Sequence, residues 1–283
     1  MVRRQRLDAE LVRRDLARSR QHAAELVAQG RVTVGGQPAA KPSTQVDLSA
    51  AVAVVDPDPG RPWASRGAHK LIGALEAFPA VVVHGRRCLD AGASTGGFTD
   101  VLLDRGAEHV VAVDVGYGQL AWRLRSDERV TVLDRTNVRS LRPEQVSPAP
   151  GLVVADLSFI SLRLVLPALA GCSAPTADLM LMVKPQFEVG RDGLGSGGVV
   201  REPRLRVSAV TGVVASALEL GIAVRGVASS PLPGPSGNVE YFLWLGRGTD
   251  DDAVPPDGAQ VHELVERVVA EGPQDGIWGG GAR

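Results

Sequence analysis

The sequence predicts an α/β protein in which a small α+β domain precedes a Rossmann-like, seven-stranded, mostly parallel sheet with helices on both faces. The chain has 283 residues, more than a usual single domain, which accommodates one small domain and one of ordinary size. From Arg86 onward, strand-like apolar runs alternate with helical segments, as in parallel sheets. Hydrophobic residues make up 44% and charged residues 22%, a composition typical of a protein with a folded core.

The first sixty residues favour two short helices followed by short strands. Apolar residues recur at helical spacing over 7–17, and Ser19 is a suitable cap for a second helix that ends at Gly30. Short strands joined by turns are expected at 32–34, around Val46 and over 51–55. The Pro- and Gly-rich stretch 56–62 predicts a linker.

The larger domain is predicted from its regular alternation. Strands are expected at 88–91, 109–113, 130–133, 152–156, 179–184, 222–228 and 239–245, and the last two are close enough to form a hairpin. Helices are expected over 95–105, 119–124 and 204–220, and from Ser161 onward. We therefore predict a first domain at 1–60, a linker at 61–66, a sheet domain at 67–248, and an acidic tail at 249–283 with a helix over 261–270.

Charge and cysteine usage restrict the class of protein. Residues 1–31 hold eight Arg against four acids, whereas 249–283 hold two Arg against eight acids, so the front end favours a polyanionic partner. The N-terminus lacks a secretory signal, and no run reaches the ~18 apolar residues of a spanning helix, so we expect a cytoplasmic protein without a membrane partner. Cys88 and Cys172 have no zinc or redox spacing, which predicts free thiols and no metal.

A glycine-rich segment, Asp-Ala-Gly-Ala-Ser-Thr-Gly-Gly-Phe-Thr from Asp90, lies between the first strand and the first helix of the sheet domain. Glycines at such a place let the backbone approach a ligand to which helix N–H groups point. The spacing of Gly92, Gly96 and Gly97 differs from the dinucleotide pattern, which disfavours a nicotinamide or flavin cofactor.

Polar residues follow the next two strands. Asp114 is placed where an acid accepts hydrogen bonds from a ribose diol; the alternative is an ordinary cap for Gly116. Asp134 and Asn137 are candidates to contact an adenine ring, and turn or cap formation is the alternative.

In combination, residues 64–246 resemble the class I S-adenosylmethionine-dependent methyltransferases. The resemblance implies S-adenosylmethionine as the cofactor. The implied cofactor residues are Asp90, Gly92, Ala93, Ser94, Thr95, Gly96, Gly97, Phe98, Asp114, Asp134 and Asn137.

Two lysines and two acids, Lys70, Asp156, Lys184 and Glu240, are spread along the same domain. Ligand sites of such sheets lie outside the carboxyl ends of the strands, so Asp156 and Lys184 are expected in one crevice with the glycine-rich segment. Each alone is also compatible with an exposed lysine paired to a nearby acid. Together they resemble the Lys-Asp-Lys-Glu tetrad of ribose 2′-O-methyltransferases.

The resemblance gives Lys184 the task of orienting the ribose hydroxyl and helping to remove its proton. An ammonium is not a base, so Lys184 must lose its proton or stabilise negative charge that develops on oxygen. Asp156 and Glu240 would position the lysines, and Lys70 would complete the network. Phe159, just past Asp156, is a candidate to stack on a base turned out of its helix, with core packing as the alternative.

The first sixty residues resemble the S4-like RNA-binding module, particularly around Arg6-Leu-Asp-Ala-Glu-Leu-Val and from Ser19 to Gly35. Alone, a few arginines on short helices are usually a solvated face. The resemblance implies phosphate contacts by Arg4, Arg6, Arg18, Arg20 and Lys41.

The S4-like module, the linker and the glycine-rich segment are followed by Asp156-Leu-Ser-Phe-Ile-Ser and Lys184-Pro-Gln-Phe-Glu-Val-Gly, and this order of segments resembles the TlyA family. The resemblance implies methylation of cytidine 2′-hydroxyls in 16S and/or 23S ribosomal RNA within ribosomal subunits, and a link to capreomycin and viomycin sensitivity. The linker Arg61-Pro-Trp-Ala64 departs from the usual Arg-Ala-Trp-Val, and Pro62 stiffens it. We expect a monomer.

Two other functions are compatible with the same family. Its haemolysin label suggests a membrane-permeabilising protein, which the absence of a spanning or basic amphipathic helix disfavours. A non-catalytic RNA-binding or ribosome-assembly protein could keep the fold as a scaffold, but a scaffold would not need the four tetrad residues.

Overall fold

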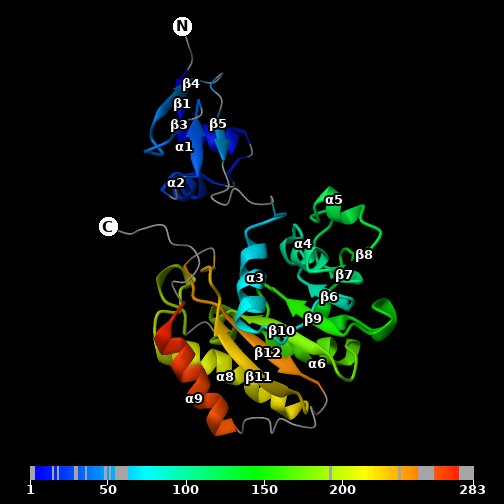
Figure 1. Ribbon diagram of the computed structural model, residues 1–283. Helices are drawn as coiled ribbons and strands as arrows, with labels where there is room; N and C mark the ends of the chain where they lie inside the picture. Colours follow the sequence, from blue (N-terminus) through cyan, green and yellow to red (C-terminus); the bar gives the residue numbers. More distant parts are fainter. Residues whose placement is uncertain are drawn as a thin grey trace. The chain divides into compact units, whose positions relative to one another are not determined.

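The computed structural model describes residues 4–14, 16–17, 19–28, 31–35, 37–47, 50, 52–54, 63–190, 193–234, 237–247 and 258–273. It divides into two compact units, residues 1–62 and 63–283 (Figure 1). The predicted linker residues 61 and 62, Arg18 and most of the acidic tail lie outside the described residues.

The first unit packs two helices against short strands. α1 (Leu7–Arg13) and α2 (Arg20–Ala28) follow β1 (Arg4–Arg6), which pairs antiparallel with β4 (Gln45–Asp47). A second sheet has the order β3-β2-β5, formed by Gln37–Pro38, Val32–Val34 and Val52–Val54. The Ser19 hydroxyl accepts from His22 N at 3.1 Å, as the predicted cap requires. Arg4 and Arg6 lie on a strand that the sequence did not predict, not on a helix.

The second unit contains the predicted seven-stranded sheet, in the order β11-β12-β10-β9-β6-β7-β8. β10, β9, β6, β7 and β8 are parallel neighbours, whereas β12 runs antiparallel to both β10 and β11, so the predicted last hairpin is confirmed. The strands are β6 (Arg87–Ala91), β7 (His109–Val113), β8 (Val130–Leu133), β9 (Leu152–Ala155), β10 (Asp178–Val183), β11 (Ala223–Ser229) and β12 (Tyr241–Gly246).

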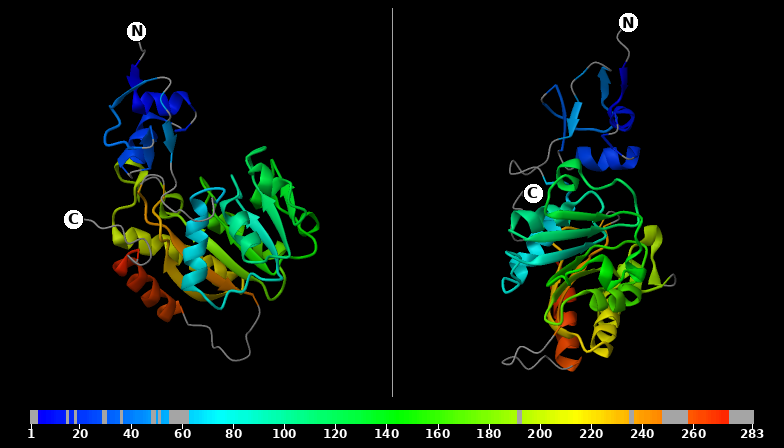
Figure 2. Two further views of the ribbon diagram at one scale, coloured as in Figure 1. Left: turned by 45° about the horizontal axis from the view of Figure 1, so that its top comes forward. Right: turned by 90° about the vertical axis from the view of Figure 1, so that its right-hand side faces the viewer.

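Helices cover both faces of this sheet (Figures 1 and 2). One apolar cluster joins the sheet to α6 (Leu162–Cys172), α8 (Pro203–Glu219) and α9 (Gly258–Glu271). The other joins it to α3 (Gly67–Ala77), α4 (Gly97–Asp104) and α5 (Trp122–Arg125). The remaining helical turns are α7 (Pro185–Glu188), η1 (Val138–Ser140), η2 (Pro143–Gln145) and η4 (Ser196–Gly198).

Several element ends differ from the predicted ones in ways that matter for function. α4 begins at Gly97 because Gly96 has a φ of 100°, which a right-handed helix does not allow. β9 ends at Ala155 and β10 at Val183, so Asp156 and Lys184 directly follow their strands. α3, which carries Lys70, was not predicted at all.

Both cysteines are buried free thiols, as predicted, and burial raises the pKa of Cys88 to about 12. Among the described residues, no helix is long and apolar enough to cross a bilayer.

Candidate active site

The four predicted catalytic residues form two ion pairs at one end of the sheet. Nζ of Lys184 lies 2.6 Å from Oδ1 of Asp156, at angles that do not suit a hydrogen bond, and donates to the Ser158 hydroxyl at 3.0 Å. Nζ of Lys70 donates to Oε2 of Glu240 at 2.5 Å. The structure therefore pairs each lysine with one acid.

The fold explains why residues so distant in sequence meet. β9 and β10 are parallel neighbours, so Asp156 and Lys184 leave the sheet side by side. β12 is antiparallel to β10 with Val183 opposite Tyr241, which places Glu240 at the same edge as Lys184. Helix α3 brings Lys70 to this edge, where its Nζ also lies 3.8 Å from the Met182 sulfur.

Burial separates these pairs from ordinary surface ion pairs. The side chains of Lys70 and Glu240 are 11% and 0% exposed, and those of Lys184 and Asp156 are 9% and 21% exposed. The alternative interpretation as exposed lysines with nearby acids is therefore wrong. Charges removed from water in this way interact more strongly with each other and with a bound ligand.

Two residues around Glu240 were not predicted. Gln186 in α7 directs its amide Nε2 to Oε1 of Glu240 at 3.5 Å. A Cβ added at Gly234 would lie 2.5 Å from the same oxygen, so glycine leaves the space that this carboxylate occupies. The only sequence signal for Gln186 is its place two residues after Lys184.

The glycine-rich segment lies directly beside Asp156. Gly92 has a φ of 88°, and a Cβ there would approach the Asp156 carbonyl oxygen to 2.6 Å. Ser94 also has a positive φ, of 48°, and Gly96 has one of 100°. The segment thus adopts a turn that needs glycine and brings its backbone against the Asp156 loop.

Asp114 fixes this turn from the end of β7. Its Oδ2 accepts from the Ser94 backbone N at 2.8 Å, and its Oδ1 accepts from the Gly116 backbone N at 2.7 Å. The alternative role as a cap for Gly116 is thus present. Each carboxylate oxygen keeps a second lone pair that can accept from a ribose hydroxyl.

Asp90 is a fully buried carboxyl under the same turn. Its Oδ2 accepts from the Thr99 hydroxyl at 2.6 Å, whereas Oδ1 has no hydrogen-bond partner among the described residues. Burial raises the pKa of Asp90 to about 7. An orphaned buried carboxylate oxygen beside a glycine turn is complementary to a cationic group of a ligand.

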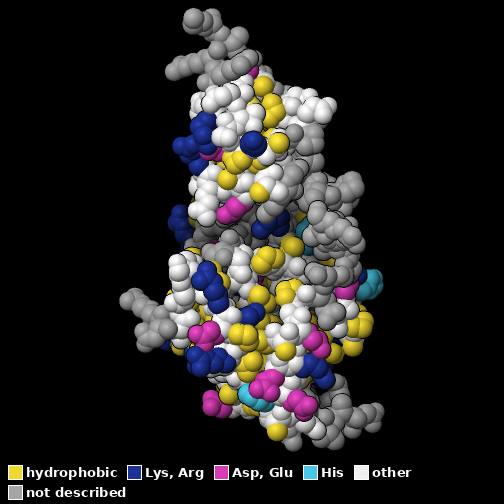
Figure 3. Space-filling model, turned by 90° about the vertical axis from the view of Figure 1, so that its left-hand side faces the viewer, with side chains coloured by type: hydrophobic (Ala, Val, Ile, Leu, Met, Phe, Trp, Pro, Cys, Tyr) yellow, Lys and Arg dark blue, Asp and Glu magenta, His cyan; other side chains and the backbone are white. Residues whose placement is uncertain are grey.

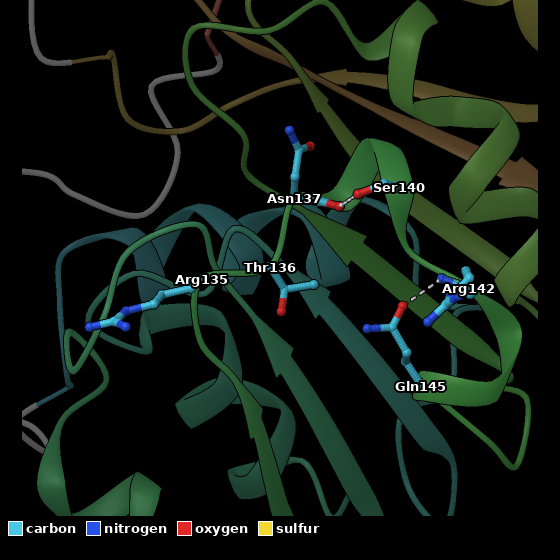
Figure 4. A pocket seen from close by; sticks show the side chains of 6 residues that line it. All are labelled: Arg135, Thr136, Asn137, Ser140, Arg142 and Gln145. Atoms are coloured by element: carbon cyan, nitrogen blue, oxygen red, sulfur yellow. Dashed lines mark hydrogen bonds between the residues drawn. The ribbon is translucent and has the colours of Figure 1, made fainter.

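The residues after β8 are engaged in local contacts. Asp134 forms an ion pair with Arg125, and Oδ1 of Asn137 accepts from Arg139 N at 3.0 Å as the cap of η1. Asn137 also lines an open polar hollow of about 470 Å³. In Figure 4, Arg142 and Gln145 of this hollow lie together while the Arg135 side chain extends away from them. None of the four predicted catalytic residues lines it.

Phe159 is displayed on the surface and does not pack in the core. The residue is 90% exposed and has a φ of 63°. The only aromatic ring within stacking distance among the described residues is that of Phe187, at 5.2 Å between centroids. The core-packing alternative is therefore wrong.

The predicted RNA-contacting residues of the first unit are partly exposed. The Arg6 and Arg20 side chains, 45% and 59% exposed, both pair with Oδ2 of Asp8, at 2.9 and 3.0 Å. Lys41 is exposed in a turn. The side chain of Arg4 and all of Arg18 lie outside the described residues. On the face of the molecule in Figure 3, basic and acidic side chains are interspersed.

Comparison with known proteins agrees with this arrangement. Residues 63–247 match the FtsJ-like methyltransferase family, and residues 5–52 match the S4 domain. A relative from Mycobacterium tuberculosis, the 16S/23S rRNA (cytidine-2′-O)-methyltransferase TlyA, is 62% identical over 96% of this chain and 100% of its own length. The protein named Hemolysin A of Brachyspira hyodysenteriae is 32% identical over 84% of this chain and 98% of its own length.

Among solved structures, a protein from Streptococcus thermophilus that carries the name hemolysin is 36% identical, covers 96% of both chains and gives a TM-score of 0.76. The matches extend over both units, and the methyltransferase match includes all four residues of the two ion pairs. The chain is therefore a methyltransferase that belongs to the TlyA family, with an S4 domain ahead of an FtsJ-like domain.

Proposed function

We propose that this protein transfers a methyl group from S-adenosylmethionine to the ribose 2′-hydroxyl of cytidine in ribosomal RNA, within ribosomal subunits. The observation that carries the proposal is the buried Lys184–Asp156 pair next to the glycine turn, with the Lys70–Glu240 pair at the same edge of the sheet. The names of the 16S/23S and 23S rRNA (cytidine-2′-O)-methyltransferase relatives support cytidine and the ribosomal target.

The residues around the glycine turn fit S-adenosylmethionine. Asp114 has free lone pairs for the ribose diol, and the orphaned Oδ1 of Asp90 suits the ammonium of the methionine part. When bound, this cofactor supplies a sulfonium methyl group that needs only an in-line nucleophile at close range. Asp134 and Asn137 are proposed as the adenine contacts.

A ribose hydroxyl is a poor nucleophile until its proton is removed, and the two ion pairs are suited to assist that removal. Lys184 orients the ribose hydroxyl, and the ammonium that it forms on taking the hydroxyl proton stabilises the negative charge left on the oxygen. For this, Lys184 first passes a proton to Asp156, whose Oδ1 lies 2.6 Å from its Nζ. Lys70 and Glu240 keep the adjacent wall of the site fixed and compensated in charge.

RNA recognition is divided between the two domains. An exposed aromatic side chain next to the Asp156–Lys184 pair is suited to stack on an unpaired base, which supports Phe159 in that role. Arg6, Arg20 and Lys41 of the S4 domain are proposed to bind phosphates, together with Arg4 and Arg18. Methylation by this enzyme is proposed to be linked to capreomycin and viomycin sensitivity.

The test is transfer of labelled methyl from S-adenosylmethionine to purified 30S and 50S subunits, with Lys184→Ala as the matched variant and mass analysis of the nucleosides. We expect labelled 2′-O-methylcytidine from the natural sequence and none from the variant, which should bind the cofactor with unchanged affinity. Absence of label in both subunits would overturn the proposed function.

Membrane permeabilisation is a second candidate only because relatives carry the name hemolysin. It predicts that Lys184→Ala still releases dye from liposomes at micromolar protein. No release from either protein excludes it.

A further inference from the structure

The loop of residues 156–161, called the Asp156 loop here, is attached at both ends to the segment 184–188. At its start, Lys184 contacts the Asp156 carboxylate at 2.6 Å and the Ser158 hydroxyl at 3.0 Å. At its end, the carboxylate of Glu188 accepts from the Ser161 hydroxyl at 2.6 Å and from the Leu162 backbone N at 2.7 Å. One attachment is catalytic in the proposed function and the other is not.

The tip of this loop, Ser158 and Phe159, is positioned by the segments on either side of it. Phe159 has a φ of 63°, a conformation that a residue with a bulky side chain rarely adopts unless its surroundings impose it. Its ring is almost wholly exposed and touches the ring of Phe187, which lies in the same short helix as Glu188. Leu157 and Ile160 are partly buried against the apolar core, so the part of the loop that lacks packing is its tip, Ser158 and Phe159.

Glu188 is built as an anchor. Its side chain is 2% exposed, and each carboxylate oxygen receives a short hydrogen bond from the first residues of α6. Arg163 adds a contact from its guanidinium to the carbonyl oxygen of Glu188 at 3.2 Å. Burial raises the pKa of Glu188, and the hydrogen bonds from Ser161 and Leu162 oppose that rise. None of these side-chain contacts involves a residue of the tetrad.

We propose that Glu188 is a positioning residue that fixes the Asp156 loop so that Phe159 presents its ring to the target nucleotide. The inference rests on the proposed function for its substrate. Glu188 itself touches neither substrate nor cofactor and acts through the loop.

The test compares Glu188→Ala with Glu188→Gln in methyl transfer to ribosomal subunits. Misplacement of a reacting group by about 1 Å costs on the order of 100-fold, so we expect Glu188→Ala to lower kcat/KM about 10- to 100-fold. The affinity for S-adenosylmethionine should stay within about twofold, because Glu188 does not contact the glycine turn. Glu188→Gln should stay within about threefold, since its amide accepts from Leu162 and donates to the Ser161 hydroxyl.

A double-mutant cycle separates positioning from general destabilisation. In a Phe159→Ala background, Glu188→Ala should add less than about a twofold loss, because both changes then remove the same contact to RNA. Asp178→Asn is the matched control: this buried carboxylate accepts from Arg86, Arg225 and Trp244 at the opposite end of β10. It should lower Tm while leaving kcat/KM within about twofold. Equal losses in both backgrounds, or an equal loss in Asp178→Asn, would overturn the proposal.

Amide hydrogen exchange of residues 157–162 gives a readout that does not depend on activity. Glu188→Ala should accelerate it, and Glu188→Gln should not. If Glu188→Ala does not fold, Ser161→Ala removes one of the two donors alone and should give a smaller loss with faster exchange. Unchanged exchange in Ser161→Ala or Glu188→Ala contradicts the anchor, whereas absence of methyl transfer by the natural sequence contradicts the proposed function instead.

Discussion

Replacing Lys70 by Met removes one partner of the most deeply buried ion pair in the site. Met keeps the length and the apolar contact near Met182, but among the described residues the Glu240 carboxylate, 0% exposed, then keeps only the amide of Gln186, at 3.5 Å, as a side-chain partner. Leaving one buried charge uncompensated costs about 3–5 kcal/mol. For a unit of this size, that loss lowers Tm by roughly 6–20 °C.

The pairing also predicts how the loss is repaired. Adding Glu240→Gln to Lys70→Met removes the uncompensated charge while keeping an amide near Gln186, so at least about half of the lost stability should return. Calorimetry of the natural sequence, both single variants and the double variant measures the coupling, and methyl-transfer assays run alongside. We expect the double variant to be stable and inactive.

The reasoning is refuted if Lys70→Met changes Tm by less than about 3 °C, or if the double variant is no more stable than Lys70→Met. Either result would mean that water or a nearby rearrangement compensates the Glu240 charge. An active double variant would show that this pair is structural only.

Three further predictions follow from the same geometry. The pKa of Asp90 is raised to about 7, and its ionised form suits a cationic ligand. The affinity for S-adenosylmethionine, measured by calorimetry, should therefore increase by up to about tenfold per pH unit below 7. Asp90→Asn should remove that dependence. Phe159→Ala should lower kcat/KM for ribosomal subunits at least about tenfold without changing the Tm or cofactor affinity; a lowered Tm would show that the ring contributes to stability instead. Changing Arg6 and Arg20 together to Ala should weaken RNA binding and reduce its salt dependence by up to about two phosphate contacts, and an unchanged salt slope would exclude phosphate binding.

The raised pKa of Asp90 also makes the stability of the folded protein depend on pH. The folded protein favours the protonated acid, so the contribution of Asp90 to stability is full below about pH 4 and decreases as the pH rises through about 7. A bound ammonium group favours the ionised carboxylate and should therefore weaken this decrease below pH 7. Comparing thermal unfolding with and without cofactor at pH 6 and pH 8 distinguishes the two states.

The sheet could be predicted from sequence because its strands are buried apolar runs of ordinary length. Strands β7 and β8 have the bounds that alternation predicts, and the acids that follow strands were placed at the correct edge. The signal is local, since each strand of this sheet can be recognised from its own four to seven residues. Helix α3 was missed because it precedes the first strand and so has no place in the strand–helix alternation.

Partners within the site could not be predicted in the same way. Nothing local to Lys70 indicates that it pairs with Glu240, 170 residues later, and not with Asp156. Glu188 is separated by 27 residues from Ser161, and only the fold brings them together. The positive φ and the exposure of Phe159 likewise have no signal in the neighbouring sequence.

The reversal of the last strand is what allows an acid that precedes a strand to join the site. In a wholly parallel sheet, a residue before a strand lies at the edge opposite to residues that follow strands. Asp156 and Lys184 both follow strands, whereas Glu240 precedes β12. Because β12 is antiparallel to β10, with Tyr241 opposite Val183, its first residue lies at the edge where β10 ends. A shift of this pairing by one residue would turn Glu240 to the other face of the sheet and leave Lys70 buried without its carboxylate, so the register of β10 and β12 is itself a requirement of the proposed catalysis.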